Sequence, residues 1–127
     1  MGKFVIKETK SGVKFDLKAG NGEVIATSEV YSSLDACKNG VASVAKNAPV
    51  AALEDQTVEG FATEKNPKFE VYADKRGEFR FRLKSRNGEI ILTGEGYVSK
   101  DGCKNGIDSI RRNADSPVEV MEPVEEQ

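Results

Sequence analysis

The chain contains two copies of one sequence unit, and this repeat constrains its fold more than any other feature. Asn21-Gly22-Glu23 recurs as Asn87-Gly88-Glu89, and Cys37-Lys38-Asn39-Gly40 recurs as Cys103-Lys104-Asn105-Gly106. Over 36 aligned positions the two copies share 19 identical residues. Near the first turn the offset falls from 66 to 65, so the second copy has one additional residue there. The pattern predicts a duplicated structural unit.

The repeat also predicts how the chain is divided. We expect one pseudo-twofold domain over residues 1–127, with a first repeat at about 2–59 and a second at about 67–121. Residues 60–66 would form the linker and 122–127 an acidic tail. Each repeat would take the place of one subunit of a symmetric dimer. We therefore expect a monomer that acts as a pseudo-dimer.

Three strands are predicted at the start of each copy, and the first of them covers residues 3–8 and 68–73, where side chains also alternate. Residues 13–18 and 79–84 alternate apolar and charged side chains. This period of two indicates half-buried antiparallel strands. The Asn-Gly pair after each of them predicts a tight hairpin turn with both residues at positive φ. The next strands, 23–27 and 89–93, are apolar on both faces, which predicts central positions in the sheet.

A helix is predicted after the strands of each copy. Ser33 and Ser99 are expected as N-caps, each followed by an acidic residue that the helix dipole favours. Apolar residues then recur at i, i+4 and i+7 and form one stripe: Cys37, Val41 and Val44, and in the second copy Cys103, Ile107 and Ile110. A short strand is expected after each helix, near 50–53 and 118–121.

Several of these motifs together resemble a known family. The paired Asn-Gly-Glu hairpins, the tyrosine before each helix (Tyr31 and Tyr97) and the two Cys-Lys-Asn-Gly motifs are similar to those of the YegP-like family of small uncharacterised bacterial proteins. The resemblance covers nearly the whole chain. It implies an α+β fold in which two tandem β-β-β-α-β repeats form a single antiparallel sheet. Both helices would pack on one face, and the C-terminal strands would cross between repeats. The resemblance implies no activity.

Composition excludes several classes of active site. The chain has no histidine, so a Ser-His-Asp or Cys-His nucleophile cannot form within it, and the commonest metal ligand is missing. Its two cysteines are too few for a disulfide scaffold. The N-terminus alternates polar and apolar residues and does not match an export signal, and no apolar run is long enough to span a membrane. We expect reduced thiols, a cytoplasmic location, no membrane association, and neither cofactor nor metal.

Residues that recur in both copies are candidates for either structure or function. Cys37 and Cys103 lie on the apolar stripe, so core packing is favoured over redox or metal chemistry. Glycine within a helix destabilises it, so Gly40 and Gly106 predict a close approach of the helix to the sheet or to the other helix, with a ligand contact as the alternative. The asparagines preceding them are expected to hydrogen-bond a neighbouring strand or loop rather than a ligand. Recurring acids are explained by hairpin, strand-end and helix-cap positions rather than by acid-base catalysis: Glu23, Glu89, Glu29, Glu95, Asp35 and Asp101.

Charge is segregated along the chain although the net charge is only −2. Residues 3–48 carry a net charge of +2, and residues 49–64, which follow them, carry −4. Residues 65–114 carry +5, and residues 115–127, which follow them, carry −5. On the strand face opposite the helices, five cations and one tyrosine are expected to lie together: Lys14, Lys18, Arg80, Arg82, Lys84 and Tyr72. This face is a solvated surface or a site for anions or nucleic acid.

These observations favour a non-enzymatic binding or interaction module with an unknown protein partner or ligand. The alternative is weak binding of RNA or single-stranded DNA through the basic face. An enzyme is disfavoured because histidine and any recognisable nucleophile motif are missing.

Overall fold

The chain forms three strands, a helix and a further strand, twice over. The first copy consists of β1 (Lys3–Thr9), β2 (Gly12–Lys18), β3 (Val24–Thr27), α1 (Leu34–Asn47), a short 3-10 turn (Ala48–Val50) and β4 (Ala52–Asp55). The second consists of β5 (Lys68–Ala73), β6 (Phe79–Lys84), β7 (Ile90–Gly94), α2 (Lys100–Asn113) and β8 (Val118–Val120). The computed structural model describes residues 2–121, so the predicted acidic tail at 122–127 lies outside it.

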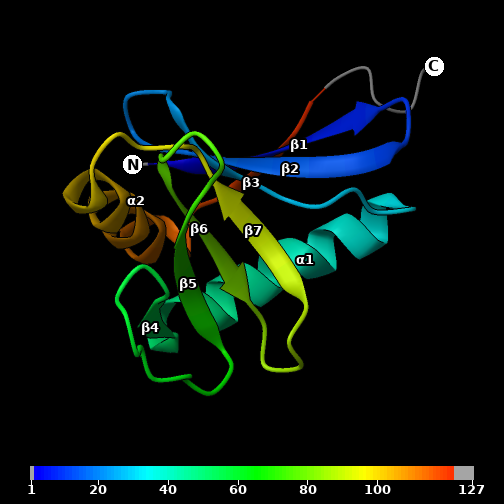
Figure 1. The fold of residues 1–127 in the computed structure, drawn as a ribbon. Helices are drawn as coiled ribbons and strands as arrows, with labels where there is room; N and C mark the ends of the chain where they lie inside the picture. Colours follow the sequence, from blue (N-terminus) through cyan, green and yellow to red (C-terminus); the bar gives the residue numbers. More distant parts are fainter. Residues whose placement is uncertain (1, 122–127) are drawn as a thin grey trace.

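All eight strands belong to one sheet, in the order β4-β5-β6-β7-β3-β2-β1-β8. Replacing each strand by its counterpart in the other copy reverses this order, which is the pattern of a pseudo-twofold axis. The third strands of the two copies, β3 and β7, pair at the centre, as their apolar composition predicted. Both helices pack on the same sheet face (Figure 1). The predicted α+β class with two repeats in a single sheet is confirmed.

The strand that follows each helix is exchanged between the copies. β4 of the first copy pairs with β5 of the second, and β8 of the second copy pairs with β1 of the first. Both of these pairs are parallel, whereas the six inner strands are antiparallel as expected. The expectation of a purely antiparallel sheet is therefore wrong at its two edges. The parallel pairs form because each helix returns the chain to the end of the sheet where the other copy's first strand begins.

The Asn-Gly hairpins differ from the predicted geometry. In the first, the Gly22 N–H donates to the Ala19 carbonyl and the Ala19 N–H donates to the Glu23 carbonyl, both at 2.9 Å. Only the glycine has positive φ, 86° in the first copy and 88° at Gly88, and no other residue type does so between residues 2 and 121. The prediction that Asn21 also takes positive φ is therefore wrong. The loop is one residue longer than a two-residue turn, so glycine alone completes the reversal.

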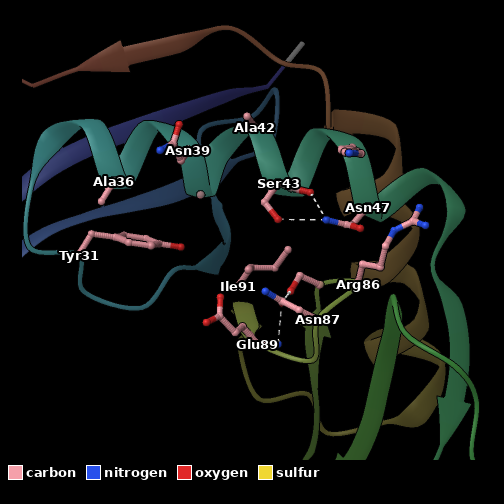
Figure 2. A pocket seen from close by; sticks show the side chains of 13 residues that line it. Tyr31, Ala36, Asn39, Ala42, Ser43, Asn47, Arg86, Asn87, Glu89 and Ile91 are labelled. Carbon is pink, nitrogen blue, oxygen red and sulfur yellow. Dashed lines mark hydrogen bonds between the residues drawn. The ribbon is translucent and has the colours of Figure 1, made fainter.

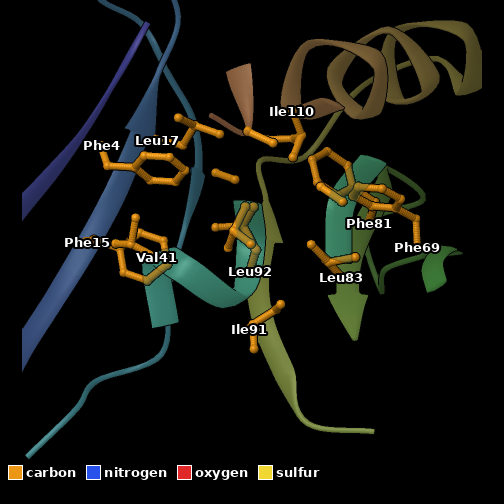
Figure 3. Close-up of a cluster of buried hydrophobic side chains, with 14 of the residues drawn as sticks. Phe4, Phe15, Leu17, Val41, Phe69, Phe81, Leu83, Ile91, Leu92 and Ile110 are labelled. Carbon is orange, nitrogen blue, oxygen red and sulfur yellow. The ribbon is translucent and has the colours of Figure 1, made fainter. Parts of the chain in front are cut away.

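The helices begin and pack as the sequence indicated. The Ala36 N–H donates to Oγ of Ser33, and the Gly102 N–H donates to Oγ of Ser99, each at 3.0 Å. α1 contacts β2 of its own copy and β7 of the other, while α2 contacts β6 and β3. One hydrophobic core therefore joins the two copies, and it contains the largest fully buried side chains (Figure 3): Phe4, Phe15, Phe69, Phe81, Ile6, Leu17, Leu83 and Leu92.

Both thiols lie in this core. Cys37 and Cys103 are completely buried and not linked to each other, which confirms the prediction. Burial raises the pKa of each thiol to about 11. A thiol that is buried and protonated at neutral pH is a poor nucleophile and a poor metal ligand.

Candidate functional site

A groove of about 600 Å³ runs between helix α1 of the first copy and the β6–β7 hairpin of the second. We call it the α1 groove. Figure 2 shows the helix along one wall and the hairpin residues along the other. Because α1 packs on β7, the two copies have to assemble before this groove can exist. Its lining is drawn from both copies: Tyr31, Ala36, Asn39, Gly40, Ala42, Ser43, Lys46, Asn47, Ser85, Arg86, Asn87, Glu89 and Ile91.

Tyr31 and Gly40 shape one part of the groove. A Cβ placed on Gly40 would lie 2.3 Å from the Tyr31 hydroxyl oxygen, so only glycine lets the phenol lie against the helix. The ring stacks on Phe15 with centroids 6.3 Å apart. The predicted close approach at Gly40 is therefore real, but the neighbour is the tyrosine before the helix rather than a strand or the other helix. Gly106 and Tyr97 repeat the arrangement in the second copy, at 2.4 Å.

Asn39 on α1 and Glu89 on the hairpin line opposite walls of the α1 groove. Both side chains are exposed, and neither makes a side-chain hydrogen bond or ion pair within the part of the chain that the structure describes. The expectation that Asn39 and Asn105 bond a neighbouring strand or loop is wrong, because both point from their helices toward solvent. Asn39 and Glu89 are each identical to their counterpart in the other copy.

The end of the groove nearest the C-terminus of α1 is cationic. Lys46 and Arg86 line it and form no ion pair with residues 2–121. Figure 2 shows Arg86 extending from the hairpin toward the end of α1 that carries Asn47, while Glu89 lies on the Tyr31 side. The groove is therefore electrostatically bipolar, with cations at one end and a carboxylate at the other.

The tyrosine before each helix has a raised pKa. Burial raises the pKa of Tyr31, and the negative charge of Glu89 on the second-copy hairpin adds to this effect. Burial likewise raises the pKa of Tyr97, with a contribution from Glu23 on the first-copy hairpin. Each phenol therefore stays protonated at neutral pH and can donate or accept a hydrogen bond.

The predicted basic surface is found on the sheet face opposite the helices, which we call the open face. Tyr72 shares this face as expected, and the guanidinium carbon of Arg82 lies 4.6 Å from its ring centroid. Lys14 and Lys18 on β2 form no ion pair with the described part of the chain. The three second-copy cations are arranged differently.

Those three cations are paired with acids. Nε of Arg80 lies 2.8 Å from Asp74, and Nε of Arg82 lies 2.6 Å from Glu70. Nζ of Lys84 lies 3.4 Å from the same Glu70 carboxylate. Much of the positive charge inferred from the sequence is therefore balanced within the molecule.

A buried ionic cluster lies at the β4–β5 edge of the open face. Nζ of Lys68 contacts Glu54 at 2.7 Å and Glu70 at 3.2 Å, and all three residues are buried. Glu54 also accepts hydrogen bonds from the Gln56 amide at 2.6 Å and from the Glu64 backbone N–H at 2.8 Å. Burial alone would raise the pKa of Glu54, but these hydrogen bonds and the Lys68 charge outweigh it and lower the pKa to about 2. The cluster ties β4 and the segment after it to β5.

Sequence reasoning missed both the acids of the open face and the α1 groove. Glu70 lies two residues before Tyr72 on β5 and therefore on the same strand face, so the strand periodicity could have placed it among the cations. Arg86 and Lys46 belong to different copies, and no local pattern brings them together. The useful signal for the groove was the identity of exposed residues between copies, at Asn39 and Glu89.

Two further findings concern metal binding and membrane-spanning helices. Within residues 2–121, no three acidic or thiol side chains are grouped so that they could hold a metal ion. In the same range neither helix is long and apolar enough to cross a membrane. The α1 groove offers hydrogen-bonding groups and charges around an apolar floor, which suits binding.

Comparisons with known proteins agree with the fold and the duplication. The family described as "Domain of unknown function (DUF1508)" matches twice, at residues 10–55 and 74–119. The UPF0339 protein YegP of Yersinia pestis is 35% identical over 119 residues, which cover 93% of each chain. A UPF0339 protein of Treponema denticola is 62% identical over 47 residues, 37% of this chain and 81% of that relative. The solution structure of yegP from E. coli, a protein of unknown function, superposes with a TM-score of 0.77 at 30% identity, covering 94% of this chain and 91% of that one.

Proposed function

Since this chain belongs to the DUF1508 family, whose description assigns no function, we propose one from its own geometry: it is a non-enzymatic module that binds a polar ligand in the α1 groove. The observation that carries the proposal is that two recurring polar residues, Asn39 and Glu89, line the same groove. They come from different copies and are exposed and unpaired within residues 2–121. Each retains its identity in both copies.

Size and chemistry support the same function. A groove of about 600 Å³ lies within the roughly 300–1,000 Å³ of small-molecule sites. Binding rather than catalysis is supported by the lack of histidine and by thiols that are buried and protonated. A cytoplasmic location is part of the proposal, and the two unlinked thiols support it.

Binding to the groove can be tested by two-dimensional NMR with a library of small polar compounds. We expect ligands to shift the amide signals of Asn39, Gly40 and Asn87. Asn39→Ala should weaken binding about fivefold, as expected for the loss of one hydrogen bond, and leave stability unchanged. Lys38→Ala is the matched control, because Lys38 is exposed on the same helix and does not line the groove. A library in which no compound shifts these signals at millimolar concentration would contradict the function.

Weak binding of RNA or single-stranded DNA by the open face is a second candidate function. It is supported by the Arg82 guanidinium over Tyr72, an arrangement on which a base could stack, and by Lys14 and Lys18, which form no ion pair with residues 2–121. The ion pairs of Arg80, Arg82 and Lys84 oppose it because a phosphate would have to displace Asp74 and Glu70.

This second function requires saturable binding of a labelled oligonucleotide at about 50 mM salt. The logarithm of the affinity should fall with the logarithm of salt by about 0.7 per phosphate contact. Tyr72→Ala should then cost about 1–3 kcal/mol of binding free energy. If the wild-type protein shows no saturation at low salt, the open face is a solvated surface.

A further inference from the structure

The two copies differ at one buried asparagine, and the difference leaves a hydrogen-bond acceptor free in the α1 groove. In both copies the helix-terminal asparagine donates its amide to the residue four positions earlier: Asn47 to the Ser43 carbonyl and Asn113 to the Ser109 carbonyl, both at 2.8 Å. In the second copy, Oδ1 of Asn113 accepts the backbone N–H of Gly2 at 3.1 Å.

The first copy has no equivalent donor. The position that corresponds to Gly2 is Pro67, which has no N–H. Oδ1 of Asn47 therefore accepts no hydrogen bond from residues 2–121, and this atom is not itself buried, so a ligand in the groove can reach it. Asn47 lines the groove, so a bound molecule can supply the missing donor.

Two cations line the same end of the groove. Lys46 is the neighbouring residue on α1, and Arg86 extends toward the same end of the helix from the hairpin (Figure 2). The first-copy counterpart of Arg86 is Gly20, so this cation is present at only one of the two hairpins. This end of the groove therefore has two cationic side chains and one hydrogen-bond acceptor. A ligand that matches it carries an anionic group next to a hydrogen-bond donor.

We propose that this end of the α1 groove binds the carboxyl terminus of a peptide. The α-carboxylate would contact Lys46 and Arg86, and the N–H of the last peptide bond would donate to Oδ1 of Asn47. Both groups belong to the last residue of a peptide, so a single ligand residue can supply the anion for the cations and the donor for Asn47. The inference rests on the proposed function and names the ligand of the same groove.

The rest of the groove can hold the preceding residues. From Ala36 to Asn47 the helix extends roughly 16 Å, which is about five residues of extended peptide. Tyr31 provides an aromatic surface, and Asn39 and Glu89 provide polar contacts along this path. An α-carboxylate next to a peptide N–H is present both in short free peptides and at the C-terminal ends of longer chains.

The test uses the whole protein and a designed probe, N-acetyl-Ala-Ser-Ala-Ser-Ala with a free carboxylate, titrated by NMR. We expect saturable shifts at Asn47 and Arg86. The same peptide as a C-terminal amide should bind about tenfold more weakly, because a charge-assisted contact is lost. N-methylation of its last peptide bond should weaken binding about threefold or more, because the donor to Asn47 is removed. The affinity of a free tripeptide is then compared with that of a longer chain that ends in the same residues. The comparison shows whether short free peptides or the C-termini of longer chains bind more tightly.

Substitutions in the protein test the same contact from the other side. Arg86→Gly introduces the residue of the first copy at an exposed position and should weaken the free-acid peptide about fivefold, with little effect on the amide. Arg76→Gly is the control, because Arg76 is an exposed cation on a different hairpin and does not line the groove. Equal affinity for the acid and the amide would overturn the inference. If other compounds still shift Asn39, the proposed function survives; if nothing shifts the groove, both fail.

Discussion

Removing β8 by ending the chain after Asp115 is expected to destabilise β1, more than 100 residues away in the sequence. The Phe4 N–H donates to the Pro117 carbonyl at 2.9 Å, and the Met121 N–H donates to the Ile6 carbonyl at 2.9 Å. Both hydrogen bonds disappear in the truncated chain, and β1 becomes an edge strand with apolar surface uncovered beside Phe4 and Ile6. Exposure equivalent to one large apolar side chain costs about 1.5–3 kcal/mol.

Amide hydrogen exchange measures this effect residue by residue. The exchange rates of the β1 amides that pair with β2 should rise about a hundredfold, because each 1.4 kcal/mol corresponds to a factor of ten. A chain ending after Met121 is the matched control, since it keeps β8 and loses only the residues beyond it. Full protection of β1 in the shorter chain would show that the exchanged strand does not stabilise the first copy.

Replacing Glu54 by alanine is expected to be the most destabilising change on the open face. The substitution leaves Lys68 buried with only Glu70 beside it, and it removes the acceptor for the Gln56 amide and the Glu64 N–H. Removing one partner of a buried ion pair costs about 3–5 kcal/mol of the free energy of unfolding.

Urea denaturation compares this variant with the wild type. Glu59→Ala is the control, because Glu59 is an exposed acid in the following segment with no ion pair to residues 2–121, and it should stay within about 0.5 kcal/mol. A loss below about 1 kcal/mol in Glu54→Ala would mean that the cluster contributes no more than an exposed ion pair.

The low pKa of Glu54 also predicts how the free energy of unfolding depends on pH. Its pKa is about 2 in the folded protein and about 4.5 in the absence of interactions. Because the folded pKa is the lower one, ionised Glu54 stabilises the protein fully above pH 4.5, and this contribution is lost as the pH falls toward 2. The difference in unfolding free energy between wild type and Glu54→Gln should therefore be largest near neutral pH and shrink across this window.

Local structure followed from local sequence. Strand alternation predicted β2 and β6, the serines at 33 and 99 cap the helices they were expected to cap, and the apolar third strands are central in the sheet. These signals are reliable because they act over two to four residues, where backbone geometry fixes which side chains face the core. The burial of the two thiols was predicted from their positions on the apolar stripe of each helix.

The candidate site could be predicted only in part. Asn39, Gly40 and Glu89 were noticed because they recur, but their roles were misjudged or left open: Asn39 makes no bond to a neighbouring strand within residues 2–121, and Gly40 accommodates a tyrosine. The six residues expected on the open face lie there, yet whether that face binds nucleic acid stays a prediction.

The sequence by itself determined the repeat, the strands, the helices and the apolar stripes of this protein. Only the tertiary structure decided that β4 and β8 are exchanged in parallel, that Glu54 and Glu70 pair with the cations, and that α1 meets the hairpin of the other copy. The physical reason is the range of the interactions. Periodicity and capping depend on neighbours along the chain, whereas burial and charge pairing select among partners that are distant in sequence, and they do so only when both copies assemble around one core.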